Sequence, residues 1–401
     1  MGSNLKEVND LDPVIRTNQR IGTIAPSATL SITAKAKALK QAGKPVISLA
    51  AGEPDFGVPD AVREAIHKAL DQQQTKYTPT SGTPELKQAV IDKLKRDQAL
   101  TAAPDSVVIS LGAKHALYNL FQVLLEPGDE VIIPSPYWVS YPEMIKLAGG
   151  KAVFVDTISN KFLMTRELIE PKITSKTRVI VLNSPSNPTG AVLSEIQIKA
   201  IANLLQERKL YCLSDEIYEY YVYDGMKHHS VASYIPNWQS HVAIVNGLSK
   251  SHSMTGLRIG YTIAHPDIAK KMGILQDHST SNPVSICQVG AIEALKMPSQ
   301  FTNNLSVTFQ KRRDLVVDLL RQIPQIEITA VPQGAFYIFV NIRKSGMKAH
   351  EFASKLLEEN FVAIIPGEGF GTDEYVRISF AASDKELTEG IQRMQNWLKS
   401  K

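Results

Sequence analysis

The chain has 401 residues, of which 43% are hydrophobic, so it is long enough for two domains with sizeable cores. Its net charge of +4 comes from 44 basic and 40 acidic residues without a basic tract, which argues against a nucleic-acid partner. The first forty residues lack the apolar stretch of a signal peptide, and no later run is long enough to span a bilayer. We therefore expect a cytoplasmic, enzyme-sized protein without a membrane partner.

The two cysteines, Cys212 and Cys287, stand alone in the sequence. Neither belongs to a disulfide framework or a metal-ligand spacing, so we predict buried, inert thiols and no metal site.

The middle of the chain predicts an α/β domain. A helix from Ser31 to Ala42, ended by Gly43, is expected to come first and to pack with the C-terminal part. Short apolar runs then alternate with helix-like stretches, which is typical of a mostly parallel sheet flanked by helices. Helix starts at Thr83-Pro84 and at Ser194, with Gln197 completing a capping box, support this interpretation. The apolar runs are 107–110, 131–133, 151–155, 178–182, 210–213, 242–245 and 259–263.

After residue 300 the pattern changes to that of a smaller α+β domain. A long polar helix is followed by strands, and a last helix opens with Ser383 and Glu386 as a capping box. We predict three parts: an N-terminal arm and helix (1–47), a large domain (48–298) and a small domain (299–401). The strands of the small domain are expected near 326–331, 334–342, 362–366 and 375–380.

Polar residues follow four of the apolar runs, where ligands gather in open parallel sheets. Gly112-Ala113-Lys114 opens a helix and could form an anion site, although a tight turn is the commoner meaning. Asn187 follows the run 178–182, between prolines that fix the backbone. Asp215 and Tyr218 come after another strand, where an aspartate is usually only a helix cap.

Lys250 and Arg258 lie eight positions apart after the strand 242–245. Most lysines are solvated surface charges, and His252 between the two is assigned no role.

Taken together, these segments resemble the motifs of class I pyridoxal-phosphate-dependent aminotransferases, which have the type I fold. The match covers nearly the whole chain, and the motifs fall in the order of the family. They are 51–56, 76–79, 135–138, 187–190, 214–218, 250–261, 334–337 and 376–379.

The resemblance implies that Lys250 carries pyridoxal phosphate as a Schiff base, a role for which lysine suits because its pKa can be depressed. Asp215 would hold the pyridine nitrogen protonated, and Tyr218 and Asn187 would bind the ring hydroxyl. Trp138 would stack on the ring and border the substrate, although a tryptophan after a strand is by default core packing.

The cofactor phosphate would be held by Gly112, Ala113 and Lys114 at a helix start and by Arg258. The resemblance adds Tyr77 from a neighbouring subunit, and hence a homodimer with shared active sites.

Arg377 would bind the substrate α-carboxylate with its planar fork, assisted by Asn187 and the backbone of Gly52. Lys250, once displaced by substrate, would move the Cα proton as general base and then acid. Amino acids and 2-oxo acids would react in turn by a ping-pong mechanism.

Two features resemble the bacterial and plant aspartate and prephenate aminotransferase subgroup: the run Pro26-Ser27-Ala28-Thr29 and the lysine at 114. Thr29 and Lys114 would hold a distal carboxylate, which favours aspartate with 2-oxoglutarate, and prephenate as an additional acceptor. The alternative is that Lys114 is only exposed on the first turn of a helix.

Other readings stay open at this point. An aminotransferase for aromatic amino acids, alanine or kynurenine, or a β-lyase, would share the same lysine, aspartate and arginine. A cofactor-sensing transcription regulator would need a DNA-binding domain, and only about fifty residues precede the motif at Gly52. Ser251-His252-Ser253 and Leu257 depart from the usual family residues and are expected to alter packing rather than remove a catalytic group.

Overall fold

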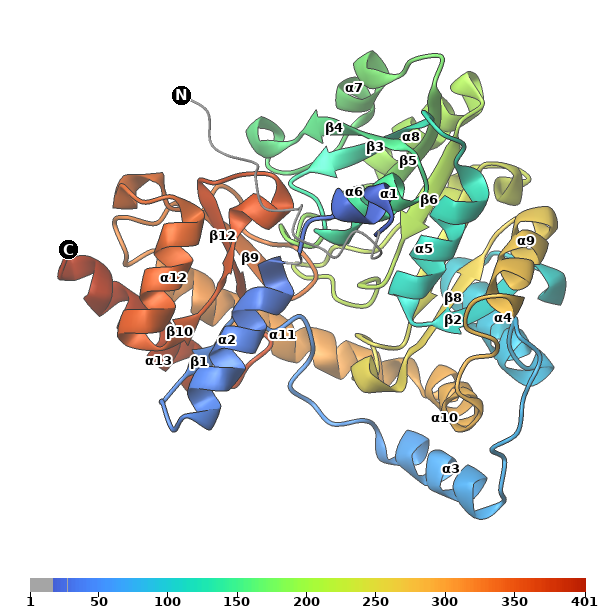
Figure 1. The fold of residues 1–401 in the computed structure, drawn as a ribbon, viewed down its shortest axis with the longest axis horizontal. Helices are drawn as coiled ribbons and strands as arrows, with labels where there is room; N and C mark the ends of the chain where they lie inside the picture. Colours follow the sequence, from blue (N-terminus) through green and yellow to red (C-terminus); the bar gives the residue numbers. More distant parts are fainter. Residues whose placement is uncertain (1–16, 27) are drawn as a thin grey trace.

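The computed structural model describes residues 17–26 and 28–401, which form two lobes built on separate sheets (Figure 1). The larger lobe, on the right in Figure 1, contains a seven-stranded sheet in the order β2-β8-β7-β6-β5-β3-β4. All neighbours are parallel except β8, which runs antiparallel to β2 and β7. The strands are β2 (Val107–Leu111), β3 (Glu130–Ser135), β4 (Lys151–Asp156), β5 (Thr177–Asn183), β6 (Tyr211–Asp215), β7 (Val242–Gly247) and β8 (Ile259–Ile263).

Each of the seven predicted apolar runs forms one of these strands, and the mostly parallel α/β fold is confirmed. The runs are continuously apolar because both faces of the sheet are covered. Val108 and Ile109, adjacent on β2, are both buried but belong to different cores, one on each face. The flanking helices are α3 (Asp60–Asp71), α4 (Pro84–Gln98), α5 (Ala113–Leu124), α6 (Ser140–Leu147), α7 (Arg166–Ile169), α8 (Glu195–Arg208), α9 (Pro266–Asp277) and α10 (Ser285–Lys296).

The predicted helix starts are confirmed by their hydrogen bonds. The Leu86 amide donates to the side chain of Thr83, with Pro84 in the first turn of α4. Ser194 forms a capping box with Gln197 at the start of α8.

The smaller lobe, on the left in Figure 1, is a three-stranded antiparallel sheet in the order β11-β12-β9 with a parallel pair of β1 and β10. Ser383 and Glu386 form the predicted capping box of its last helix. Its strands are β1 (Ile47–Ser48), β9 (Tyr337–Asn341), β10 (Val362–Ala363), β11 (Ile365–Pro366) and β12 (Tyr375–Ser379). The remaining helices are α1 (Gln19–Gly22), α2 (Ala28–Gln41), α11 (Ser299–Leu320), α12 (Ala349–Asn360) and α13 (Asp384–Lys399).

The prediction of a strand at 326–331 was wrong. Only Glu327 makes a bridge, to Asn341 on β9. Ile326 is buried in the core, but prolines at 324 and 332 bracket the segment and shorten the stretch that can join a ladder.

Helix α2 begins at Ala28, three residues before the predicted start, and ends at Gln41. Its buried residues Ile32 and Ala36 pack in a core with Ile365 and Phe370 of the smaller lobe. The helix therefore contacts the C-terminal part, whereas the division of the chain at residues 47 and 298 stays a prediction.

Both cysteines are free and buried, and burial raises the pKa of the Cys212 thiol. None of the helices in the described part of the chain is long and apolar enough to cross a bilayer.

A buried cluster of charges lies between α4 and the ends of β6 and β7. The Lys93 ammonium donates to Glu219 Oε2 over 2.6 Å, and Asn246 Nδ2 donates to Glu219 Oε1 over 2.6 Å. Glu216 lies 3.2 Å from His228 Nε2. Burial alone would raise the pKa of Glu216. The charge of His228 and several hydrogen bonds outweigh this effect and lower the pKa to about 2. The cluster ties α4 to the loop that follows β6 and to the end of β7.

Replacing Lys93 with Met should destabilise the protein by about 3–5 kcal/mol, because Glu219 would remain buried without its cation. The free energy of unfolding in urea measures the change. Lys95→Met, at an exposed position of the same helix, is the matched control and should change stability by less than about 0.5 kcal/mol. An equal effect of both variants would contradict the role given to the buried pair.

Candidate active site

A cavity of about 320 Å³ lies where the carboxyl ends of the central strands face the smaller lobe. It brings together most of the residues predicted from the sequence, from both lobes and from α2. They are Thr29, Gly52, Ala113, Lys114, Trp138, Asn187, Asp215, Tyr218, Lys250, Arg258 and Arg377. Gly112 lies next to it at the start of α5, and Tyr77 does not line it.

Lys250 lies in the loop after β7, and its ammonium donates to the Gly52 carbonyl oxygen over 2.5 Å. Burial lowers the pKa of Lys250 to about 8. Glu53 opposes this shift, and the charges of Arg258 and Arg377 add to it. The amine is thus closer to its neutral, nucleophilic form at neutral pH than a solvated lysine would be.

Asp215 is the last residue of β6 and is 4% exposed. Its Oδ2 accepts a hydrogen bond of 2.6 Å from the Tyr141 hydroxyl, and its Oδ1 accepts one of 3.3 Å from the Ile217 amide. Burial raises the pKa of Asp215 to about 6, and these two hydrogen bonds oppose the rise. No α-helix follows β6 directly, so the side chain is not a helix cap. A cation placed beside this carboxylate would be strongly favoured.

Asn187 is held in place by its own loop and by the neighbouring strand. Its backbone amide donates to Asn183 Oδ1 over 2.9 Å, and Asn183 Nδ2 donates to the Asp215 carbonyl oxygen over 3.2 Å. Its peptide bond to Pro188 is cis, and the side chain is buried. The two hydrogen bonds join the Asn187 loop to the ends of β5 and β6, from which its side chain lines the cavity.

Arg377, on β12, is buried at 2% exposure. Its Nη1 donates to Asn187 Oδ1 over 3.0 Å and its Nη2 donates to the Ala50 carbonyl oxygen over 2.9 Å. Its Nε has no hydrogen-bond partner among the described residues. The guanidinium lies over the rings of Tyr337 and Phe370, 4.3 and 5.2 Å from their centroids. A buried, partly unsatisfied cation of this kind fits a carboxylate ligand.

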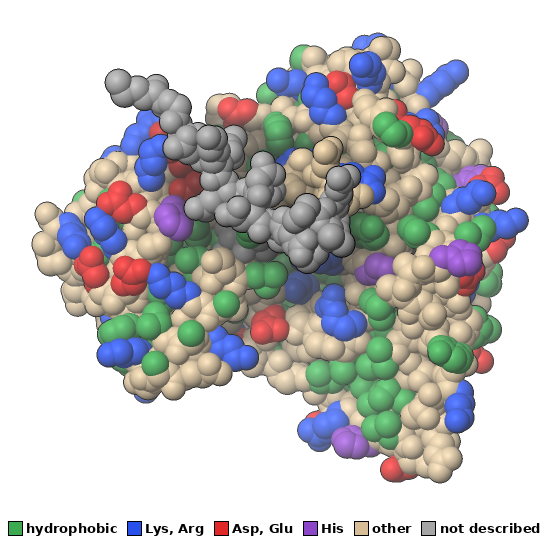
Figure 2. All heavy atoms as spheres, viewed as in Figure 1, with side chains coloured by type: hydrophobic (Ala, Val, Ile, Leu, Met, Phe, Trp, Pro, Cys, Tyr) green, Lys and Arg blue, Asp and Glu red, His purple; other side chains and the backbone are tan. Residues whose placement is uncertain are grey.

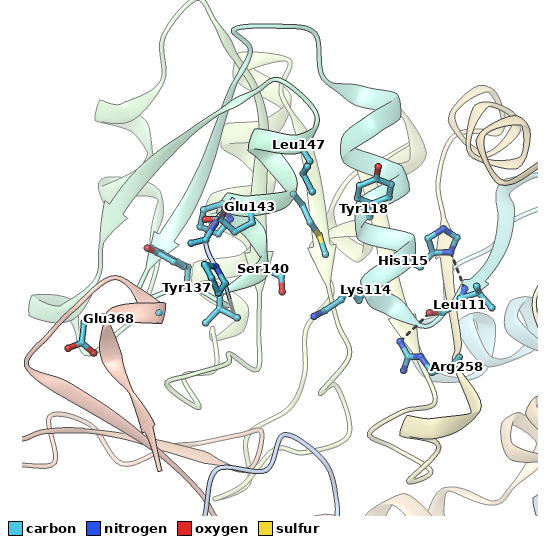
Figure 3. Close-up of a pocket in the computed structure, with 16 residues that line it drawn as sticks. Leu111, Lys114, His115, Tyr118, Tyr137, Ser140, Glu143, Leu147, Arg258 and Glu368 are labelled. Carbon is cyan, nitrogen blue, oxygen red and sulfur yellow. Dashed lines mark hydrogen bonds between the residues drawn. The ribbon is translucent and has the colours of Figure 1, made fainter. Parts of the chain in front are cut away.

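An anion site is built where α5 begins. Gly112 has a φ of 84°, and a Cβ there would approach Arg258 Nη2 to 2.5 Å. Arg258 Nη1 and Nη2 donate to the carbonyl oxygens of Thr255 and Leu111 over 2.7 and 3.2 Å. The guanidinium is thereby fixed against the helix start (Figure 3), where free amides favour an anion.

Lys114 separates this cavity from a larger one of about 640 Å³ that is shown in Figure 3. The residue is exposed, but its ammonium lies 5.0 Å from the centroid of the Trp138 ring. Partial burial, followed by the charge of Arg258, lowers the pKa of Lys114. The side chain therefore borders the site rather than pointing into free solvent.

Tyr77 is 91% exposed in the single chain. Such exposure is compatible with a contact to a second chain, and the contact stays a prediction. Ser27, part of the 26–29 run, lies outside the described residues, as does the start of the predicted N-terminal arm.

Two polar residues of the cavity were missed by sequence reasoning, Ser249 and Tyr337. Ser249 directly precedes Lys250, and this adjacency is the sequence signal that could have identified it as a cavity residue. Tyr337 ends the motif 334–337, which carried no assigned role. Pairing of β9 with β12 places it beside Arg377.

The residues that depart from the family pattern do not line the cavity. His252 is buried and stacks on Phe301, with 5.4 Å between ring centroids, and burial lowers its pKa to about 4. Leu257 packs against a core of the larger lobe. Both side chains pack behind the site, and the expectation that the departures leave the catalytic groups in place stays a prediction.

Comparison with known proteins gives one family. The model of class I and II aminotransferases matches residues 44–394. The chain belongs to this family of aminotransferases. An aspartate aminotransferase from Geobacillus stearothermophilus is 46% identical over 389 residues, covering 96% of this chain and 99% of the relative. A probable aspartate/prephenate aminotransferase from Rickettsia felis is 43% identical, covering 94% and 95%.

Solved structures that resemble this chain also include aspartate aminotransferases. The aspartate aminotransferase from Rhizobium meliloti has a TM-score of 0.90 at 39% identity, covering 96% of this chain and 99% of the other. The Thermus thermophilus enzyme with maleate has a TM-score of 0.90 at 38% identity, covering 96% and 100%. The type I fold of these aminotransferases is confirmed.

Class I and II aminotransferases use pyridoxal phosphate, and this protein is a pyridoxal-phosphate-dependent aminotransferase. The residues present fit the cofactor: an amine with a depressed pKa at Lys250, a buried carboxylate at Asp215 and an anion cradle at Gly112 and Arg258. The donor set thus matches an aldehyde, a pyridine nitrogen and a phosphate.

Modification of Lys250 in the cofactor-free enzyme by a neutral amine reagent should increase with pH around a midpoint of about 8, because only the neutral amine reacts. Mass spectrometry of the peptide that bears Lys250 measures the rate. Solvated lysines have a pKa of about 10.4, so exposed lysines of the same protein should still gain reactivity at pH 10.

The same pKa has a consequence for stability. The folded enzyme releases this proton near pH 8 and the unfolded chain near 10.5, so the contribution of Lys250 to stability should rise with pH in that window. A midpoint for Lys250 equal to that of the exposed lysines would contradict the burial argument.

Proposed function

We propose that this protein transfers the amino group of L-aspartate to 2-oxoglutarate by a ping-pong mechanism, with prephenate as an additional acceptor. One observation carries the proposal: besides Lys250 and Arg258, which is assigned to the cofactor phosphate, two further cations, Arg377 and Lys114, line the cavity. A dicarboxylic amino acid has two carboxylates to satisfy and one reacting carbon between them. The names of the relatives in Geobacillus and Rickettsia agree with this substrate class.

Arg377 binds the α-carboxylate. Its hydrogen bonds to Asn187 and to the Ala50 carbonyl fix the plane of the guanidinium, and its Nε remains available for a ligand. Two parallel hydrogen bonds from such a fork orient the substrate as well as hold it. Asn187 and the backbone at Gly52 border the same space.

Lys114 and Thr29 bind the distal carboxylate. Thr29 lies on α2 and Lys114 on α5, so the two groups reach the cavity from different helices. The Thermus enzyme, solved with maleate, is an example of a relative that takes a dicarboxylate ligand. A side chain without this charge would leave Lys114 uncompensated, which gives selectivity.

Bound pyridoxal phosphate supplies an electron-withdrawing ring that makes the Cα proton of an attached amino acid acidic. Lys250 would hold the cofactor through its amine, and once displaced by substrate that amine would accept the Cα proton as general base and give it back as general acid. Asp215 would keep the pyridine nitrogen protonated, and burial of its carboxylate would strengthen the attraction.

The other side chains of the cavity would complete the cofactor site. Tyr218 and Asn187 would donate to the ring hydroxyl, and Trp138 would supply an aromatic face for the ring. The start of α5 at Gly112, Ala113 and Lys114 would bind the phosphate together with Arg258.

The proposal includes a cytoplasmic homodimer. Tyr77 is 91% exposed in the single chain, and in a dimer it would complete the phosphate site of the neighbouring subunit. The two buried, unpaired cysteines suit a reducing compartment.

An absorption spectrum tests the central claim. The wild-type enzyme with pyridoxal phosphate should show a visible band that bleaches on addition of aspartate, and Lys250→Ala should show neither the band nor the bleaching. Bleaching by alanine or aromatic amino acids alone would refute the substrate class. Absence of any band would refute the role of Lys250.

Lys114→Ala should lower kcat/KM for aspartate by about 10²-fold, because the distal carboxylate would be desolvated without a cation. The value for alanine as donor should change less than about threefold, since alanine has no distal charge. Steady-state kinetics with both donors measure the difference.

Lys114→Arg, which keeps the charge, is the matched control and should retain part of the preference for aspartate. Equal losses for aspartate and alanine would mean that Lys114 acts on the cofactor rather than on the substrate.

A further inference from the structure

Tyr337 is the first residue of β9 and is buried at 1% exposure. It lies in the smaller lobe but lines the cavity beside residues of the larger lobe. Two of its contacts are with side chains to which the proposed function gives roles: its hydroxyl contacts Tyr218, and its ring contacts Arg377.

The hydroxyl contact is a hydrogen bond. The two phenol oxygens of Tyr337 and Tyr218 lie 2.9 Å apart, and no other hydrogen bond to the Tyr218 hydroxyl occurs among residues 17–26 and 28–401. A phenol has one proton to donate. If Tyr337 donates to Tyr218, the proton of Tyr218 is left free to point toward the cofactor ring.

The backbone at Gly52 also limits the position of the Tyr337 hydroxyl. A Cβ on Gly52 would lie 3.3 Å from Tyr337 Oη, so the absence of a side chain at Gly52 makes room for it. The charged or titratable groups that act on this phenol are Arg377, Tyr218 and Glu53. Among the described residues, Tyr218 is the only one of these groups that forms a hydrogen bond with Tyr337 Oη.

The ring contact is a cation–π interaction. The Arg377 guanidinium carbon lies 4.3 Å from the Tyr337 ring centroid, closer than to Phe370 at 5.2 Å. A desolvated interaction of this kind stabilises the cation and restricts the tilt of its plane. The orientation of the guanidinium decides which of its N–H groups face the cavity.

We propose that Tyr337 is a positioning residue that acts on both halves of the site: its hydroxyl directs the Tyr218 hydroxyl toward the cofactor ring, and its ring sets the plane of Arg377. The inference rests on the proposed function, because it needs the roles given there to Tyr218 and Arg377. It adds a link between the cofactor-binding and substrate-binding groups through one side chain.

Two variants separate the hydroxyl from the ring. Tyr337→Phe removes the hydroxyl and keeps the ring, whereas Tyr337→Leu removes both. Tyr223→Phe is the matched control, because Tyr223 is also buried and donates to the Ala335 carbonyl, two residues from Tyr337, without lining the cavity. Circular dichroism confirms that each variant folds.

Tyr337→Phe should raise the apparent pKa of the visible band of the lysine-bound cofactor by about half a unit or more, because the Tyr218 hydroxyl would donate less strongly to the ring oxygen. Its kcat should fall several-fold, on the order of a single lost hydrogen bond, while KM for aspartate changes little. Tyr223→Phe should leave the pKa of the band unchanged.

Tyr337→Leu should in addition weaken maleate binding to the enzyme about tenfold, measured by calorimetry, because Arg377 loses its supporting ring. An unchanged band pKa in Tyr337→Phe, or an equal shift in Tyr223→Phe, would overturn the proposal. Unchanged maleate binding in Tyr337→Leu would also overturn it.

Failure of the proposed function is recognised separately. If the wild-type enzyme lacks the lysine-dependent band, the proposed function fails and the inference about Tyr337 falls with it. If the wild type shows the band and its bleaching with aspartate while Tyr337→Phe matches it in pKa, only the inference fails.

Discussion

The parallel register of β5, β6 and β7 is the constraint on which the site depends. Asn183 pairs with Asp215, and Asp215 pairs with Val245, so the three strands end within two residues of one level of the sheet. The loops that follow carry Asn187, Tyr218 and Lys250. Because parallel strands all end at one edge, chemically different groups from distant parts of the chain converge there without long connections. The reversed direction of β8 sends Arg258, which precedes that strand, to the same edge.

Burial at this edge determines the chemistry of the groups it gathers. The same loss of water lowers the pKa of Lys250 to about 8 and raises that of Asp215 to about 6. The first shift makes the Lys250 amine more nucleophilic. The second reflects a buried carboxylate at Asp215, next to which a cation is favoured. Both pKa shifts would be lost if the site were open to solvent. The smaller lobe and α2 complete the cavity wall, and this closure makes the fold of the C-terminal part a condition for catalysis by the larger lobe.

Most of this arrangement could be predicted from the sequence, for identifiable reasons. The strands are buried on both faces, so their sequences are continuously apolar and predict strands clearly. Lys250, Asp215 and Asn187 each follow one of these runs within a few residues. The strand predicted at 326–331 did not form because a ladder needs an available partner along its whole length, and only Glu327 makes a bridge.

The contacts of Tyr337 and Arg377 could not be predicted. They depend on the antiparallel register of β9 with β12 and on the approach of two lobes. Lys114 is a mixed case. Its place on the first turn of α5 was expected, but only the structure shows its ammonium against Trp138 rather than in open solvent. Most groups that directly follow a strand were predicted, with Ser249 as an exception, whereas the contacts that join different elements were not.

Arg377 illustrates how the protein prepares a site for a charged ligand. A guanidinium at 2% exposure has lost nearly all its water, and only two of its three nitrogens are satisfied by the described residues. Such a group is destabilising unless its surroundings compensate. Here the rings of Tyr337 and Phe370 and the oxygens of Asn187 and Ala50 supply partial compensation, while no carboxylate within residues 17–26 and 28–401 is hydrogen-bonded to it. A resident carboxylate would stabilise the fold more, but a substrate would then have to displace it. Aromatic faces and neutral oxygens hold the cation in place and leave its strongest interaction for the ligand.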